Sequence, residues 1–226
     1  MKPKLNALIV GAGGVASYML PALNNSFELS GILMDADILE EHNLDRQIFS
    51  KAHIGKHKAV SLRAYHKLNG LLPLPEYIDD GFVLRNEDGL KGIEIVICLV
   101  DNHPARRACI HTAEELDIPI LMAGNEYETS QAIYYHPDMS PSLMPQQRYP
   151  EILTSDEGSP IRCTGEVLGS TPQLAIANQV AAGLANFLLW IWHGDKHYDP
   201  AKTAGYEPIE LTTTYSGTKT ITVNER

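Results

Sequence analysis

Residues 7–16, Ala-Leu-Ile-Val-Gly-Ala-Gly-Gly-Val-Ala, are the most informative stretch of the chain. The apolar run that ends at Val10 is short and bounded by glycine, as expected of a buried parallel strand. Gly11, Gly13 and Gly14 then form a turn that opens a helix, where backbone N–H groups and the helix dipole favour a phosphate. Glycine lets the backbone approach that phosphate with no Cβ in the way. The stretch therefore predicts a nucleotide site, but not which nucleotide.

Carboxylates follow the strands of the predicted sheet. A second apolar run, residues 29–34, ends on Asp35 and Asp37, and a later run ends on Asp101 and Asn102. A carboxylate at the tip of the second strand can accept hydrogen bonds from a ribose hydroxyl. Since ligands in parallel sheets bind at the carboxyl ends of the strands, we expect these four side chains to share one site.

Strands alternate with helices over the first 136 residues. This alternation predicts an α/β domain with a mostly parallel sheet and helices on both faces. We expect strands over residues 5–10, 29–34, 73–80, 93–100, 118–122 and 131–135, and helices over residues 15–24, 53–66 and 104–116, the first interrupted by Pro21.

The last third of the chain has a different composition. Residues 138–171 are rich in proline, glycine and serine, which predicts a long loop of the kind that forms lids or binding segments. The apolar residues 173–192 predict a buried or interface helix, and Asn178 and Gln179 within it argue against a membrane span. Two alternating segments between residues 209 and 223 predict a C-terminal hairpin.

Composition limits the function. The length of 226 residues suits one domain with an extension. The formal net charge of −10 argues against a nucleic-acid partner. The first strand begins too early for a signal peptide, so we expect a cytoplasmic protein without a membrane anchor. Cys98, Cys109 and Cys163 contain no C-x-x-C pair, so we expect neither a disulfide framework nor a zinc site.

A polar run after the second strand favours one class of nucleotide. The glycine turn alone slightly favours the dinucleotide coenzymes NAD and FAD. However, Asn43, Arg46, Gln47 and Lys58 follow closely, and a triphosphate needs such groups whereas a dehydrogenase does not. Arginine makes bidentate contacts with phosphate oxygens and lysine adds a mobile charge. Asp101 could hold the magnesium ion that accompanies a triphosphate.

The sequence resembles the ThiF/MoeB branch of the ubiquitin-activating-type enzymes, in a small form like those of bacterial and mobile-element operons. The resemblance extends over residues 5–190, including Gly124, Gln131 and a cysteine loop with Cys163. The motifs that carry it are Gly11-Ala12-Gly13-Gly14, Met34-Asp35-Ala36-Asp37, Asn43-Leu44-Asp45-Arg46-Gln47, Ile54-Gly55-x-x-Lys58-Ala59 and Val100-Asp101-Asn102 with Arg106.

The resemblance implies a Rossmann-like fold and ATP- and Mg²⁺-dependent adenylation of a C-terminal carboxylate, typically the Gly-Gly end of a ubiquitin-like β-grasp protein. It implies that Asp35 binds the ribose, that Asn43, Arg46 and Lys58 grip the phosphates, and that Asp101 coordinates magnesium. Residues 1–136 would form the ATP-binding adenylation core, 137–172 the crossover loop, and 173–226 a helix and hairpin that complete the same domain. The rest of the predicted ATP site is Gly11, Gly13, Gly14, Asp37, Gln47 and Asn102.

Several points stay open at this stage. Cys163 is either a nucleophile that takes the activated carboxylate as a thioester or an ordinary loop cysteine. Relatives often supply an arginine from the N-terminal segment of a partner subunit, and no arginine precedes Arg46 here. Either Lys2 or Lys4 replaces it, or another residue crosses over, or the activity is reduced. A homodimer is expected from the same relatives, with Trp190 and Trp192 in the core or at the interface.

Three other functions compete with adenylation. An NAD- or FAD-dependent oxidoreductase on the same fold would need a second domain or a hydride-positioning group. A non-catalytic nucleotide-binding protein could act through partner binding. The tRNA-modifying dehydration chemistry of some relatives is disfavoured by the net charge of −10.

Overall fold

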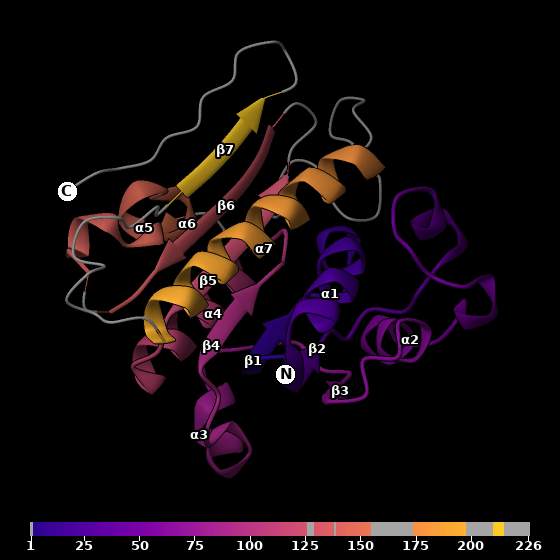
Figure 1. Cartoon of the computed structure of the whole chain (residues 1–226), viewed down its shortest axis with the longest axis horizontal. Coiled ribbons are helices and arrows are strands. Elements are labelled where there is room, and N and C mark those ends of the chain that lie inside the picture. The colour runs from indigo at the N-terminus through magenta and orange to yellow at the C-terminus, as the bar shows by residue number, and fades with distance from the viewer. Residues whose placement is uncertain (1, 126–128, 138, 155–173, 198–209, 215–226) are drawn as a thin grey trace.

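The computed structural model describes residues 2–125, 129–137, 139–154, 174–197 and 210–214. They form one seven-stranded sheet in the order β3-β2-β1-β4-β5-β6-β7 (Figure 1). The first five strands in this order are parallel to one another, and β6 and β7 each run antiparallel to the preceding neighbour. The strands are β1 (Lys4–Val10), β2 (Glu28–Met34), β3 (Leu71–Leu74), β4 (Ile95–Cys98), β5 (Ile120–Asn125), β6 (Thr129–Tyr135) and β7 (Glu210–Thr214).

Helices cover both faces of the sheet. The chain steps one way from β1 to β2 and the other way from β4 to β5, and right-handed crossovers then place α1 (Gly14–Ser26) and α4 (His103–Leu116) on opposite faces. The long helix α7 (Ala175–His197) packs beside α1 and against β5 and β6 (Figure 1). The remaining α-helices are α2 (Lys58–Tyr65), α3 (Phe82–Asn86), α5 (Pro145–Arg148) and α6 (Glu151–Thr154).

The parallel half follows directly from the hydrophobic pattern. Strand β1 lies between β2 and β4, and Ala7, Leu8 and Ile9 are fully buried. A strand with helices over both faces buries both of its sides, which is why its sequence is continuously apolar instead of alternating. The predicted α/β architecture, with its mostly parallel sheet and helices on both faces, is therefore confirmed.

Three predicted elements have different limits in the structure. Helix α1 runs through Pro21 to Ser26, so the predicted interruption is wrong; packing of Met19 and Leu23 in the core outweighs the lost backbone hydrogen bond. Helix α2 begins only at Lys58, because Gly55 has a φ of +83° and breaks the expected helix. Strand β3 ends at Leu74, and its proline is tolerated because β3 is an edge strand.

The predicted long loop and C-terminal hairpin are only partly covered by the described residues. Residues 139–154 contain α5, α6 and a 3₁₀ turn, so this part of the expected structureless loop is ordered. Strand β7 pairs with β6, whereas the second arm of the predicted hairpin lies outside the described residues, as does Cys163.

Helix α7 is long and apolar enough to cross a membrane by composition alone. Of the most apolar window within residues 175–194, 39% is buried inside the protein. Its contacts with α1, β5 and β6 show that one face of the helix packs against the sheet and α1.

Candidate active site

A cavity opens at the carboxyl ends of β1, β2 and β4, where the sequence predicted a site. We call it the glycine-turn cavity. Seven of the predicted site residues line it, and they come from four separate stretches of the chain. They are Gly11, Gly13, Asp35, Asp37, Lys58, Asp101 and Asn102.

The glycine turn has the geometry of an anion cradle. Gly11 has a φ of +100°, and its N–H donates to the Met34 carbonyl at 2.8 Å. A Cβ added to Gly11 would lie 2.7 Å from the backbone oxygen of Leu99, so no larger residue fits. Gly13 is the N-cap residue of α1 and provides no side-chain cap. The N-cap residue therefore offers no side-chain acceptor to the first-turn N–H groups of α1, and such free N–H groups are what binds phosphate at helix N-termini.

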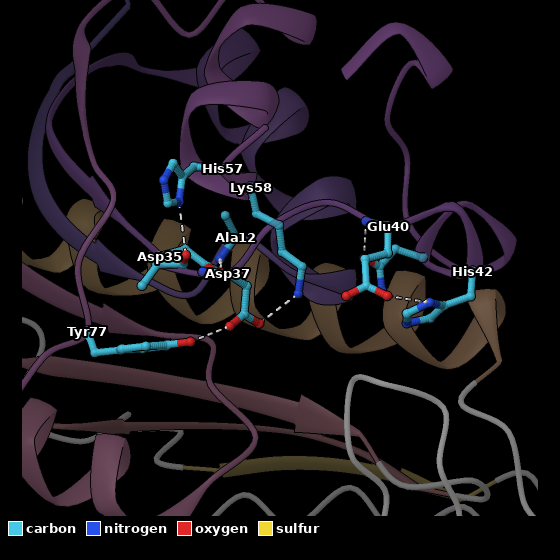
Figure 2. Close-up of polar contacts among 10 residues, drawn as sticks. Ala12, Asp35, Asp37, Glu40, His42, His57, Lys58 and Tyr77 are labelled. Atoms are coloured by element: carbon cyan, nitrogen blue, oxygen red, sulfur yellow. Dashed lines mark hydrogen bonds and ion pairs between the residues drawn. The ribbon is translucent and has the colours of Figure 1, made fainter. Parts of the chain in front are cut away.

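Asp35 fixes the shape of this turn. Its Oδ2 accepts a hydrogen bond from the Ala12 N–H at 2.7 Å, and its Oδ1 accepts one from the Asp37 N–H at 2.8 Å (Figure 2). Burial raises the pKa of Asp35, although the charge of Lys58 and the two backbone bonds act in the opposite direction. Each carboxylate oxygen has a further lone pair, so the predicted ribose contact stays compatible with this bracing role.

Asp37, Lys58 and Tyr77 form a bonded trio on the cavity wall. Lys58 Nζ lies 2.8 Å from Asp37 Oδ2, and the Tyr77 hydroxyl donates to Asp37 Oδ1 at 2.8 Å (Figure 2). Burial alone would raise the pKa of Asp37, but the hydrogen bond and charge of Lys58 lower it overall. The lysine side chain is only 5% exposed, so its charge is held in place instead of moving freely in water.

Tyr77 is a site residue that the sequence did not reveal. It follows β3, in a segment that the apolar pattern assigned to a strand, and no glycine turn or motif spacing marks it. The bond to Asp37 is the main cause that raises the pKa of Tyr77, so its hydroxyl keeps its proton and remains a donor. Only the path of the chain after β3 brings it to the cavity.

Arg46 lies behind the turn in a buried position. Its side chain is 7% exposed, and Nη1 donates to the His42 carbonyl at 3.3 Å. Within the described part of the chain, Nε and Nη2 are buried and meet no acceptor. A buried guanidinium with unused donors is costly unless an anion satisfies them. Arg46 therefore fits an anionic ligand, although it does not line the glycine-turn cavity.

Asn43, Gln47 and Gly14 also lie outside the lining of that cavity. Asn43 is buried, and its Oδ1 accepts a hydrogen bond from the Glu40 N–H at 3.0 Å, so it shapes the turn that carries Arg46. Gln47 is buried, and neither polar atom of its side chain has a partner among the described residues. Their predicted contacts with phosphate remain predictions.

Asn178 on α7 connects this run to the first turn of α1. It is 1% exposed, and its Nδ2 donates to the Arg46 carbonyl at 3.2 Å. A Cβ added to Gly14 would lie 2.4 Å from Asn178 Nδ2, so Gly14 is needed for this packing. The sequence shows Asn178 only as a polar residue in an apolar helix, which is a signal for a buried hydrogen bond that could have identified it.

The β4–α4 turn supplies Asp101 and Asn102. Asn102 Oδ1 accepts a hydrogen bond from the Ala105 N–H at 2.9 Å and so caps α4. Among the residues that the structure describes, no three acidic, histidine or cysteine side chains form a preformed metal cluster. Magnesium bound with a nucleotide needs only one or two carboxylates besides phosphates and water, so Asp101 in the cavity wall fits that use.

The N-terminal lysines do not reach this cavity within one chain. Lys2 Nζ donates to the Asn24 carbonyl at 2.8 Å, and Lys4 begins β1. The glycine-turn cavity is at the other end of that strand. A single copy of the chain therefore offers neither lysine as a replacement for the relatives' arginine.

Comparisons with known proteins agree with this architecture. The chain is 26% identical over 167 residues to SUMO-activating enzyme subunit 2 of Dictyostelium discoideum, an alignment that spans 69% of this chain and 25% of that protein. It is 27% identical over 188 residues to the adenylyltransferase and sulfurtransferase MOCS3 of Mus musculus, spanning 79% and 40%. The chain thus corresponds to less than half the length of either relative.

Solved structures share the fold. The structure of E. coli MccB with ATP superposes with a TM-score of 0.67 at 18% identity, covering 98% of this chain and 63% of that one. PaaA superposes with a TM-score of 0.65 at 16% identity, covering 98% and 72%. The ThiF family matches residues 3–212. The chain therefore belongs to the ThiF family.

Proposed function

We propose that this chain binds ATP with magnesium at the glycine-turn cavity and adenylates the C-terminal carboxylate of a ubiquitin-like protein or a peptide. The observation that carries the proposal is the gathering of a glycine turn, two strand-end aspartates, a buried lysine and Asp101 in one cavity. The unused buried donors of Arg46 nearby add a second, independent requirement for an anion.

The reaction needs electrostatic help more than proton transfer. A carboxylate oxygen attacks the α-phosphorus of ATP, the bond to the oxygen bridging to the β-phosphate breaks, and pyrophosphate leaves. The products are an acyl-adenylate and pyrophosphate. Two anions must approach each other, so positioning and neutralisation of charge account for most of the catalysis.

Each part of the site has a role in this scheme. The N–H groups of the glycine turn and of the first turn of α1 hold phosphate oxygens, and Asp35 accepts from the ribose. Lys58, steadied by Asp37, and Arg46 offset the negative charge of the phosphate chain. Asp101 would hold the magnesium ion, which supplies further charge neutralisation when it is bound with ATP.

Named relatives support adenylation and two kinds of substrate. MOCS3 is named as an adenylyltransferase, and one relative is a subunit of a SUMO-activating enzyme. MccB has been solved with ATP and with MccA. The NAD- or FAD-dependent alternative has no such relative among these proteins, and tight NADH binding without ATP binding would favour it.

Exchange of radioactive pyrophosphate into ATP tests the proposal. The substrates to test are ubiquitin-like proteins and short peptides, each offered with a free C-terminal carboxylate. We expect exchange that depends on both magnesium and the substrate and that is lost in Asp101→Ala. No exchange with any carboxylate substrate, although ATP binds, would leave the chain as a nucleotide-binding partner protein.

The oligomeric state of the chain belongs to the same proposal. We infer a homodimer that covers the outer face of α7, where Ile176, Phe187 and Trp190 are 55%, 56% and 57% exposed. These positions lie on one stripe of the helix. Light scattering after size exclusion should give twice the chain mass, and Phe187→Glu should give the monomer.

The proposal also includes transfer of the activated carboxylate to Cys163 as a thioester. A thiol-sensitive adduct lost in Cys163→Ala would establish the thioester step.

A further inference from the structure

A second cavity, of about 280 Å³, lies between α4, the antiparallel strand pair β5–β6, and the short helices α5 and α6. We call it the α4 cavity. Its polar lining consists of His103, Arg106, Asn125, Thr129, Gln131, Tyr149 and Glu151. Its volume is at the lower end for small-molecule sites, so it suits a group of one or two residues and not a folded partner.

The α4 cavity adjoins the glycine-turn cavity. Leu99 to Asn102 line the glycine-turn cavity, whereas Cys98, His103 and Arg106 line the α4 cavity. The two cavities thus lie on either side of the turn between β4 and α4. Arg106 Nε donates to the Val100 carbonyl at 3.3 Å, which holds the guanidinium along this shared wall. A chain end that reaches the ATP site across this turn therefore has the α4 cavity beside it.

One wall of the α4 cavity is already satisfied within the protein. Gln131 Nε2 donates to Glu210 Oε1 at 2.6 Å, and the Tyr149 hydroxyl donates to the same oxygen at 2.7 Å. Arg148 forms an ion pair with the other oxygen of Glu210. Burial, with the bond to Glu210, raises the pKa of Tyr149 to about 12, so the hydroxyl stays neutral. This wall is a rigid support that joins β7 to α5.

The opposite wall has hydrogen-bonding groups that are not used within the described protein. His103 Nδ1 and Asn125 Nδ2 are buried and have no hydrogen-bond partner in the described part of the chain. An amide nitrogen can only donate, and so can the guanidinium of Arg106, which lies beside Gly124. Burial and the charge of Arg106 lower the pKa of His103, while Glu151 acts in the opposite direction. A neutral ring carries one proton, so His103 Nδ1 donates in one tautomer and accepts in the other, and the fixed donors of this wall are Asn125 and Arg106. Such a wall matches a ligand group that accepts hydrogen bonds.

We propose that the α4 cavity selects the terminal residue of the substrate, and that it takes a side chain with an acceptor oxygen, an amide or a carboxylate, instead of a Gly-Gly end. The proposal rests on the proposed function, since it uses the ATP site to orient the chain end. A terminal glycine has no side chain to fill the cavity. It would therefore bring no acceptor for the buried donors of the cavity wall. Sites built to hydrogen-bond a group discriminate strongly against ligands that lack it.

Chain-end probes test this directly. We would measure binding of N-acetyl-L-asparagine, N-acetyl-L-aspartate, N-acetyl-L-alanine and N-acetylglycylglycine by isothermal calorimetry, with a non-hydrolysable ATP analogue present and absent. We expect the asparagine or aspartate probe to bind about tenfold more tightly than the alanine and diglycine probes. The better of the two probes then shows whether the cavity prefers an amide or a carboxylate.

Variants assign the preference to the cavity. Asn125→Leu keeps the size of the side chain but removes the donor, and it should reduce the preference to less than about twofold while ATP binding is unchanged. His103→Phe provides a second variant if Asn125→Leu does not fold. His111→Ala, on the exposed part of α4, is the matched control and should keep the full preference.

The outcomes separate this proposal from the adenylation proposal. Selective probe binding without any pyrophosphate exchange would support the cavity and reject adenylation. Exchange driven by a Gly-Gly-ended protein, with probes that bind without selectivity, would reject only the cavity. Equal or tighter binding of the diglycine probe, selectivity that survives both variants, or no probe binding at all would overturn the proposal.

Discussion

The parallel half of the sheet and its antiparallel edge each carry a cavity, and the two cavities differ in how many of their polar groups have hydrogen-bond partners within the described protein. Around the glycine-turn cavity the polar side chains already have partners. Asp35 accepts a hydrogen bond from the backbone of Ala12, and Asp37 is bound by both Lys58 and Tyr77. Around the α4 cavity, one wall is equally complete, but His103 Nδ1 and Asn125 Nδ2 meet no partner in the described structure. A preorganised site suits a ligand part that never changes, such as a nucleotide, and unused donors suit a group that the substrate supplies.

The largest expected effect on the rate of pyrophosphate exchange comes from removing the buried positive charge of Lys58. Lys58→Met should lower kcat for pyrophosphate exchange by about 100-fold or more, because charge near the transferring phosphate is the main source of catalysis. Lys56→Met is the matched control, since Lys56 lies two residues earlier on the exposed surface and should behave as wild type. Equal exchange rates in the two variants would show that the parallel half does not neutralise phosphate charge.

Next in size is the effect on stability of filling the glycine turn. Gly11→Ala meets the Leu99 backbone at 2.7 Å and also forces a positive φ, so we expect a loss of about 3 kcal/mol in the free energy of unfolding. Gly55→Ala also has a positive φ but open space around it, and should lose only about 1 kcal/mol. Urea denaturation measures both; equal losses would remove the argument for close packing at the turn.

A smaller effect should follow from removing the hydrogen bond between α7 and the Arg46 segment. Asn178→Ala removes the hydrogen bond to the Arg46 carbonyl, so the arginine should be less well placed, raising the KM for ATP by about tenfold. Asn186→Ala removes a comparable bond, from the same helix to the Met19 carbonyl, which is far from the site. We expect the KM for ATP to rise in Asn178→Ala alone, with similar melting temperatures in both variants.

The smallest effect concerns pH. The folded structure lowers the pKa of Asp37, so the pair with Lys58 contributes stability that is fully present above about pH 4 and is lost as pH falls through the lowered value. Wild type should therefore be more stable than Asp37→Asn at pH 7, and the two should converge in strong acid. Tyr77→Phe removes one donor and should move the convergence to higher pH. A difference between wild type and Asp37→Asn that is constant with pH would contradict the assignment.

The sequence predicted the parallel half well, because local signals define it. The apolar runs, the glycine turn and the strand-end aspartates each carry a pattern of their own, and the parallel sheet brings the strand ends to one edge. Asp35, Asp37, Lys58 and Asp101 consequently meet in one cavity, as expected.

The antiparallel edge and the long-range contacts could not be predicted in the same way. Tyr77 and Asn178 reach the site only through the path of the chain, and neither has a spacing that marks it. Glu210 was not expected to join Gln131 and Tyr149, because a buried network across β6, β7 and α5 depends on tertiary pairing. Helix α1 passed through Pro21 for the same reason: core packing outweighed the local signal.

Calorimetric titration of ATP tests the central claim most directly, namely that the buried cations behind the glycine turn hold a triphosphate chain. We predict that wild type and Lys56→Met bind ATP with magnesium with equal affinity, and that Arg46→Met binds about 100-fold more weakly. We also predict that NADH does not compete. Undiminished ATP binding in a folded Arg46→Met variant, or tight NADH binding in place of ATP, would contradict the account.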